Sequence, residues 1–98
     1  MTVNYNREAE KLTVAIQGRL DTITAPELEK NLGENLGGVT ELVLDMTGLE
    51  YVSSAGLRVI LKTQKLMFNV GKMKLVGVNE SVMEVFEITG FSEILNIE

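Results

Sequence analysis

The sequence predicts a single α/β domain: a mostly parallel, mixed sheet of five strands with helices in its crossover connections. Segments with the alternating pattern of strands take turns with amphipathic segments long enough for helices. In addition, residues 42–44 form a continuous apolar run, which is typical of a strand buried inside a parallel sheet. Because 98 residues are enough for one hydrophobic core but not for two, the predicted domain spans residues 1–98.

The chain opens with two predicted strands. Residues 2–6 alternate weakly between polar and apolar side chains, and residues 12–16 alternate clearly. The mostly polar residues 8–11 between them predict a turn, and Gly18 is expected to end the second strand.

A first helix is predicted over residues 25–36, whose apolar side chains recur on one face. Thr24 and Glu27 have the spacing of a capping box, in which each side chain bonds an amide at the helix start. Pro26 is tolerated because the first turn needs no internal amide donor. The pair Gly37-Gly38 is expected to end the helix.

The second half of the chain continues the alternation of strands and helices. It predicts, in order, a central strand over 39–45, a helix over 54–69, a strand within 70–78, a helix between Asn79 and Gly90, and a fifth strand over 92–97. On the 54–69 helix the cations Arg58, Lys62 and Lys65 lie outside the apolar face. They form either an ordinary solvated face or a contact for an acidic partner. Met67, Phe68 and Met73 are expected to belong to the core.

Composition excludes several classes of function. The formal charge of −5 and the pI near 4.7 argue against binding to nucleic acid or to an anionic membrane surface. The chain has no cysteine and no histidine, which removes thiolate and Ser-His nucleophiles and the commonest zinc ligands. No apolar run reaches the roughly 20 residues of a membrane helix, and no signal segment opens the chain. We therefore expect a cytoplasmic protein that is not an enzyme.

Ser53 and Ser54 stand at a predicted junction between a strand and a helix. The first amides of a helix have no internal partner, so either hydroxyl could serve as an N-cap. A phosphoryl group there would meet the same amides and the positive end of the helix dipole. Gly56 either leaves room for a kinase to approach or is needed for packing. These residues therefore predict either a structural cap or a phosphorylation site.

Two acids follow predicted strands. Asp21 comes after the second strand and Asp45 ends the central one. In parallel sheets functional residues gather at the carboxyl ends of the strands, so both acids could share one edge with Ser53 and Ser54. Alternatively, each carboxylate only orients backbone amides.

These motifs together resemble the STAS domain family, which includes bacterial anti-sigma factor antagonists. The resemblance covers almost the whole chain. It rests on the order and spacing of four segments, Gly18-Arg19-Leu20-Asp21, Ala25-Pro26-Glu27-Leu28, Leu42-Val43-Leu44-Asp45 with Ser53-Ser54-Ala55-Gly56-Leu57, and Met73-Lys74-Leu75-Val76-Gly77-Val78. Family members commonly have aspartate where this chain has Ser53, and often continue into a final helix.

The resemblance implies a partner switch. The unmodified protein would bind an anti-sigma factor that is also a serine kinase, and thereby free a sigma factor. Phosphorylation of Ser54, with Ser53 as the second choice, would end the binding, and a metal-dependent serine phosphatase of the PP2C type would restore it. The chain itself would need no cofactor. The implied partner surface comprises Asp21, Thr22, Ser53, Ser54, Ala55, Gly56, Leu57 and Arg58.

Two other classes compete with this interpretation. A STAS module that only docks into a multi-protein complex would use the same surface without phosphorylation, and the missing aspartate at Ser53 favours it. A phosphoacceptor receiver domain would present Asp45, but its acidic pair and its later lysine are not convincingly placed in this sequence. An esterase is excluded because the sequence has neither a nucleophile elbow nor a histidine.

Overall fold

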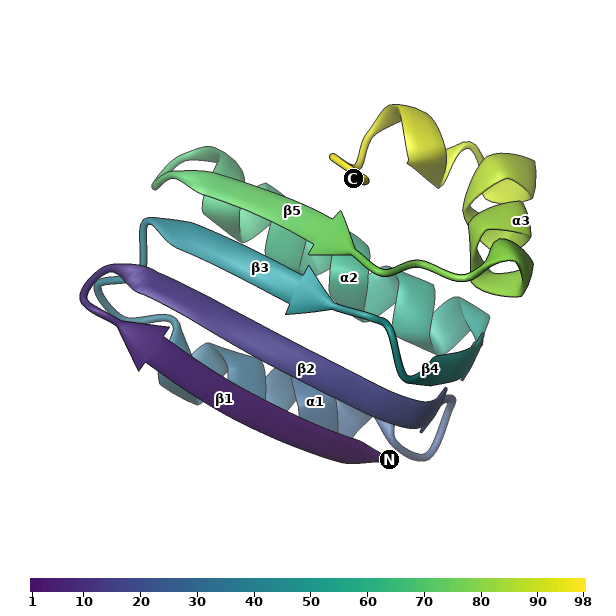
Figure 1. The fold of residues 1–98 in the computed structure, drawn as a ribbon, viewed down its shortest axis with the longest axis horizontal. Coiled ribbons are helices and arrows are strands. Elements are labelled where there is room, and N and C mark those ends of the chain that lie inside the picture. The colour runs from purple at the N-terminus through teal and green to yellow at the C-terminus, as the bar shows by residue number, and fades with distance from the viewer.

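The computed structural model describes all 98 residues as one layered α/β domain (Figure 1). The strands are β1 (Thr2–Glu8), β2 (Lys11–Leu20), β3 (Glu41–Asp45), β4 (Leu49–Val52) and β5 (Lys72–Val76). The helices are α1 (Ala25–Asn35), α2 (Ser54–Phe68), α3 (Glu80–Thr89) and the short 3₁₀ helix η1 (Phe91–Glu93).

The sheet is mixed, and most of its pairings are parallel. Its main path runs in the order β1-β2-β3-β5, and β4 pairs with β2 beyond the end of β3. Only β1 and β2 are antiparallel, while β2 pairs in parallel with both β3 and β4, and β3 with β5. The predicted fold class and the central place of β3 are therefore confirmed.

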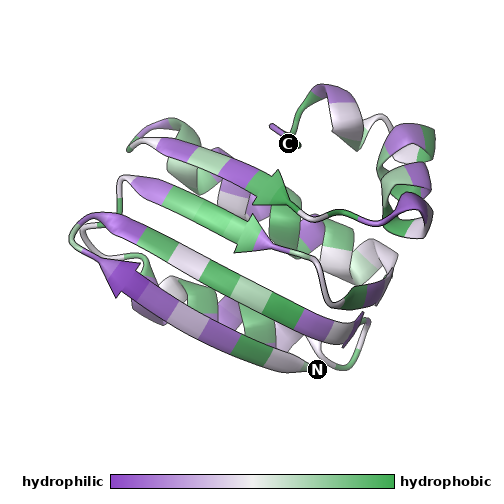
Figure 2. Cartoon of the chain, in the orientation of Figure 1, coloured by the Kyte–Doolittle hydropathy of each residue, from purple (hydrophilic) through white to green (hydrophobic).

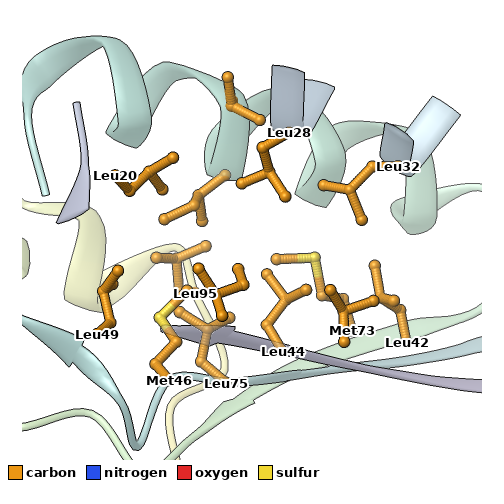
Figure 3. Close-up of a cluster of buried hydrophobic side chains, with 14 of the residues drawn as sticks. Leu20, Leu28, Leu32, Leu42, Leu44, Met46, Leu49, Met73, Leu75 and Leu95 are labelled. Carbon is orange, nitrogen blue, oxygen red and sulfur yellow. The ribbon is translucent and has the colours of Figure 1, made fainter. Parts of the chain in front are cut away.

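Helices α1 and α2 cover one face of the sheet, and the other face is open (Figure 1). Hydropathy alternates along β2 (Figure 2), and its apolar residues Leu12, Val14 and Ile16 are buried in the core. Figure 3 shows Leu28 and Leu32 of α1 opposite side chains of the sheet, among them Leu42, Leu44 and Met73. This single layer of packing holds α1 and α2 in place.

Strand β2 continues past Gly18 to Leu20, so the prediction that Gly18 ends it is wrong. Gly18 has a φ of +93°, a conformation that glycine adopts at little cost. The pairing of β2 with β4 shifts register between Gly18 and Arg19, which marks a β-bulge. The strand therefore bends at this glycine and carries on, and its last residues pair with a strand that the sequence did not predict.

The predicted strand over residues 92–97 is also wrong. The segment opens with η1 and joins the sheet only through a bridge between Leu75 and Ile97. Leu75 donates its amide to the Asn96 carbonyl at 2.9 Å and accepts from the Glu98 amide at 2.8 Å. Leu95 is buried against the core, which explains the apolar pattern of the segment without a strand.

Both predicted signals at the ends of α3 are confirmed. The Asn79 side chain accepts a hydrogen bond from the Val82 amide at 2.9 Å, and Gly90 ends the helix in the left-handed conformation.

On α2, Met67 is buried as expected, but Phe68 is 79% exposed and does not belong to the core. No helix of the structure is long and apolar enough to cross a membrane.

Candidate functional site at the start of helix α2

Strands β2 and β4 end side by side, and a helix begins shortly after each of them. The Ser53 amide donates to the Leu20 carbonyl at 2.9 Å, which ties the start of α2 to the end of β2. This bond brings the loop between β2 and α1, with Asp21 and Thr22, next to the first turn of α2 (Figure 1). The site is therefore assembled from two segments that lie about 30 residues apart in the sequence.

The two serines at this junction occupy different positions. Ser53 is the N-cap of α2, and its Oγ accepts from the Gly56 amide at 3.3 Å. Ser54 is the first residue of the helix, and its side chain is exposed. No hydrogen bond within the chain involves the Ser54 hydroxyl. Of the two hydroxyls, only that of Ser54 has no hydrogen-bond partner within the chain.

Gly56 and Leu57 face inward. A Cβ atom on Gly56 would lie 2.7 Å from Leu20 Cγ and 3.0 Å from the Leu20 carbonyl oxygen, so the glycine lets α2 approach β2. Leu57 is part of the core. Ala55 is half-buried and Arg58 is exposed, which leaves these two on the accessible side of the helix.

Asp21 organises the loop that precedes α1. Its Oδ1 accepts from the amides of Ile23 and Thr24, both at 3.0 Å. The hydrogen bond from the Thr24 amide is the largest influence on this carboxyl, and it lowers the pKa. The Ile23 amide, the Thr24 hydroxyl and the charge of Arg19 lower it further, and together they outweigh partial desolvation, which raises it, so the pKa of Asp21 lies below the usual range. The predicted capping box is wrong, because the Thr24 hydroxyl donates to the Arg19 carbonyl at 2.9 Å and caps no amide of α1.

Asp45 does not share this edge. Its register partner is Ala15, whereas Ser53 bonds Leu20, five residues further along β2. Five strand residues span about 16 Å, so β4 separates the two positions. Asp45 instead holds its own turn, accepting from the Thr47 amide at 3.0 Å and the Thr47 hydroxyl at 2.7 Å. For Asp45 the expectation of a shared edge is therefore wrong.

A groove between α1 and α2 opens beside the site. It has a volume of about 530 Å³ and begins at Thr22 and Ala55. Its floor includes Ala25 and Val59, and the cations of α2 line it: Arg58, Lys62 and Lys65. Lys62 pairs with Glu29 across the groove at 3.0 Å. The groove therefore extends the accessible surface from Ser54 along α2.

Sequence reasoning missed three residues of this surface. Ile23 is 85% exposed in the β2–α1 loop, although isoleucine is usually buried. The Arg19 guanidinium lies over the ring of Tyr51, 4.2 Å from its centroid. The position of Ile23 between two predicted elements could have indicated exposure. The contact of Arg19 with Tyr51 depends on β4, which was not predicted.

Fold and site together define a small α/β domain with an exposed serine hydroxyl at the start of a helix. The family model described as the STAS domain matches residues 2–98. The chain therefore belongs to the STAS domain family.

Relatives in this family are named for sigma factor control. BtrV of Bordetella bronchiseptica, described as a candidate anti-sigma factor antagonist, is 39% identical over 88 residues, which cover 88% of this chain and 76% of BtrV. The anti-sigma-B factor antagonist of Staphylococcus aureus is 30% identical over 86 residues, covering 86% of this chain and 80% of the relative.

The fold is also that of the Bacillus anti-sigma factor antagonist SpoIIAA. Its unphosphorylated form superposes with a TM-score of 0.78 at 16% identity, covering 99% of this chain and 87% of SpoIIAA. Its phosphorylated form gives a TM-score of 0.77 at 17% identity, covering 99% and 91%. At these identities the likeness establishes the shared fold.

Proposed function

We propose that this chain is a cytoplasmic anti-sigma factor antagonist that is controlled by phosphorylation of Ser54. The unmodified protein binds an anti-sigma factor that is also a serine kinase, and a sigma factor is released for transcription. The kinase transfers the γ-phosphoryl group of ATP to the Ser54 hydroxyl, and the complex separates. A metal-dependent serine phosphatase of the PP2C type removes the phosphate. ATP and the metal ions belong to these two partners, and this chain acts as their substrate.

The contrast between the two serines carries this proposal. The hydroxyl of Ser53 is engaged in capping α2, while that of Ser54 is exposed and free. A phosphate on Ser54 would stand at the amino end of a 15-residue helix, where the dipole favours negative charge. The names of the two relatives support the antagonist function. SpoIIAA has been solved with and without phosphate, which supports the compatibility of this fold with both states.

The proposed partner surface surrounds this hydroxyl. Asp21, Thr22, Ser53, Ala55 and Arg58 lie on or near the accessible side of the junction. Gly56 and Leu57 are buried, so their part in the surface is indirect: they fix the position of the first turn of α2 against Leu20. The partner would thus contact both the loop after β2 and the start of α2.

A phosphate can reverse binding without refolding the chain. It adds about −1.5 to −2 charges and three acceptor oxygens at the centre of this surface. Weakening a complex a hundredfold requires about 2.7 kcal/mol. Like-charge repulsion and the desolvation of a buried phosphate are large enough to supply that amount.

The test is a binding titration against the anti-sigma factor kinase from the same genome. Four forms of the chain are compared: unmodified, Ser54→Ala, Ser54→Asp, and a form carrying phosphoserine at position 54 installed during translation. The unmodified and Ser54→Ala forms should bind alike, and the phosphoserine form should bind about a hundredfold more weakly or worse. Equal binding by the unmodified and phosphoserine forms would contradict the proposal.

One observation favours a second candidate function. Ser53 stands where family members commonly have aspartate, which removes a carboxylate from the surface that a kinase or phosphatase would recognise. A docking module that is never phosphorylated would tolerate this change. In that case Ser54→Asp would bind its partner as the unmodified chain does, and the kinase would leave Ser54 unmodified.

A further inference from the structure

Helices α2 and α3 carry opposite charges. Helix α2 has three cationic side chains and no acidic one, although the whole chain has a net charge of −5. Helix α3 has three acidic side chains and no cationic one. This segregation leaves one basic and one acidic helix on the surface of the same small domain.

The charged residues of the two helices follow the same spacing. The stripe of α2 consists of Arg58, Lys62, Lys65 and Leu66, at positions i, i+4, i+7 and i+8. The stripe of α3 consists of Glu80, Glu84, Glu87 and Ile88, again at i, i+4, i+7 and i+8. Residues at these intervals share one face of a helix. Each stripe is therefore a row of three like charges with an apolar side chain beside its last member.

Both stripes are accessible and largely unpaired. All eight side chains are exposed, including Leu66 at 55% and Ile88 at 84%. The ion pairs of the chain are Lys11–Glu41, Lys62–Glu29 and Lys74–Glu98, so none joins one stripe to the other. Helix α3 stands at the end of the sheet near β4, while α2 lies behind the sheet (Figure 1). Apart from Glu29 beside Lys62, neither stripe therefore has a complementary charged partner within the chain.

We propose that a second copy of this chain docks its α3 stripe along the α2 stripe. With the two helices parallel, one register aligns all four pairs: Arg58 with Glu80, Lys62 with Glu84, Lys65 with Glu87, and Leu66 with Ile88. The incoming helix lies over the groove between α1 and α2, and its Glu84 replaces Glu29 as the partner of Lys62. Gly33 lines a separate, smaller hollow further along the same two helices, beside Leu66. It has nothing within 4 Å of where a Cβ would stand, so a second backbone can come close there.

The contact is between unlike surfaces, so it is heterologous. It either closes into a small ring or continues from copy to copy. Exposed ion pairs contribute little stability, and the negative net charge of each copy repels the other. Self-association is therefore expected only at high protein concentrations. Because Arg58 also lies on the surface proposed for the anti-sigma factor, the two contacts would exclude each other. The self-association does not depend on the proposed function.

Disulfide trapping tests the contact directly, because the chain has no cysteine of its own. A Leu66→Cys chain and an Ile88→Cys chain are mixed with oxidised glutathione, which is reduced as the two thiols form one disulfide. The control mixes Phe68→Cys with Ile88→Cys, since Phe68 is more exposed than Leu66, at 79% against 55%, but lies outside the stripe. The Leu66–Ile88 heterodimer should form in several-fold excess over the control and over the Leu66→Cys homodimer. Equal yields of the three products would overturn the proposal.

Charge reversal provides an independent test by sedimentation at concentrations up to about 1 mM, where a weak contact is populated. The unmodified chain should show an average mass above its 10.8 kDa. The Arg58→Glu/Lys65→Glu and Glu80→Lys/Glu87→Lys variants should each be monomeric, and their mixture should associate again. A Lys30→Glu/Lys72→Glu variant, which changes the net charge equally outside the α2 stripe, should associate more than Arg58→Glu/Lys65→Glu. A mixture that stays monomeric while each variant keeps its fold by circular dichroism would contradict the docking.

Discussion

Ser53 and Ser54 are neighbours with the same side chain, yet only one of them contributes to the fold. The Ser53 hydroxyl satisfies an amide of α2, and the Ser54 hydroxyl bonds nothing in the chain. Ser53→Ala should therefore lower the free energy of unfolding by about 1 kcal/mol, the typical cost of a lost N-cap. Ser54→Ala should change it by less than about 0.5 kcal/mol, as exposed positions do.

Urea denaturation of both variants measures this difference. Ser53→Thr is the matched control, because threonine keeps the capping oxygen. If Ser54→Ala were the more destabilising change, the assignment of Ser53 as the cap would be wrong.

Asp21 is expected to make the stability of the fold depend on pH. The Thr24 amide is the main reason that the pKa of this carboxyl lies below its ordinary value of 3.8. A carboxyl with a lowered folded pKa contributes stability above its unfolded pKa and loses it as pH falls through the folded value. Asp21→Asn, which keeps an acceptor oxygen for the two amides, should thus flatten the fall in stability from about pH 5 downward.

Thermal melts from about pH 6 to pH 2 compare the Asp21→Asn variant with the unmodified chain, since this window brackets the ordinary aspartate pKa. Asp45→Asn is a suitable control, because Asp45 likewise accepts hydrogen bonds from its own turn but lies outside the loop before α1. A steeper acid loss in Asp21→Asn than in the unmodified chain would refute the assigned direction of the pKa.

At the scale of elements, the helix glycines Gly33 and Gly56 show how the same residue type serves different needs. A Cβ on Gly33 in α1 would meet nothing within 4 Å, so Gly33→Ala should stabilise the chain by about 0.5–1 kcal/mol through helix propensity. A Cβ on Gly56 in α2 would collide with Leu20, and overpacking of this kind costs about 1–3 kcal/mol. The two Gly→Ala changes should therefore shift the urea midpoint in opposite directions, and a shift in the same direction would contradict the packing.

The elements with strong periodicity could be predicted from the sequence, and the short ones could not. The 54–69 helix and the strand over 39–45 have long apolar patterns and were placed within a few residues of α2 and β3. Strand β4 has only four residues, and two of them, Glu50 and Tyr51, are exposed, so no alternation distinguishes it from a loop. Residues 92–97 have an apolar pattern because Leu95 enters the core from irregular structure.

The unpredicted β4 also explains which parts of the site could be predicted. Ser53, Ser54 and Asp21 meet because β4 extends the chain to the end of β2. For the same reason Asp45, which precedes β4, is left about 16 Å behind along β2. The chemistry of the site could thus be read from the sequence, but the distances between its residues depend on a strand without a sequence signal.

At the scale of the whole molecule, the proposed switch requires a surface that changes and a fold that does not. The first turn of α2 is fixed by Gly56 and Leu57 against the core, and the Ser54 hydroxyl points away from it into solvent. Phosphoserine at position 54 should therefore leave the strands and α3 unchanged. Amide chemical shifts of the phosphoserine form should differ only near residues 20–24 and 52–58, and shifts spread through β1, β5 or α3 would indicate refolding instead.

The proposed switch is tested most directly by intact-mass and phosphopeptide analysis of this protein recovered from its native cells during growth and stress. The account predicts a form heavier by one phosphate, located on Ser54. A phosphate on Ser53 would keep the switch but contradict the role assigned to the cap. With a synthetic phosphopeptide added to establish sensitivity, the absence of any phosphate under all conditions would contradict the switch and favour the docking module.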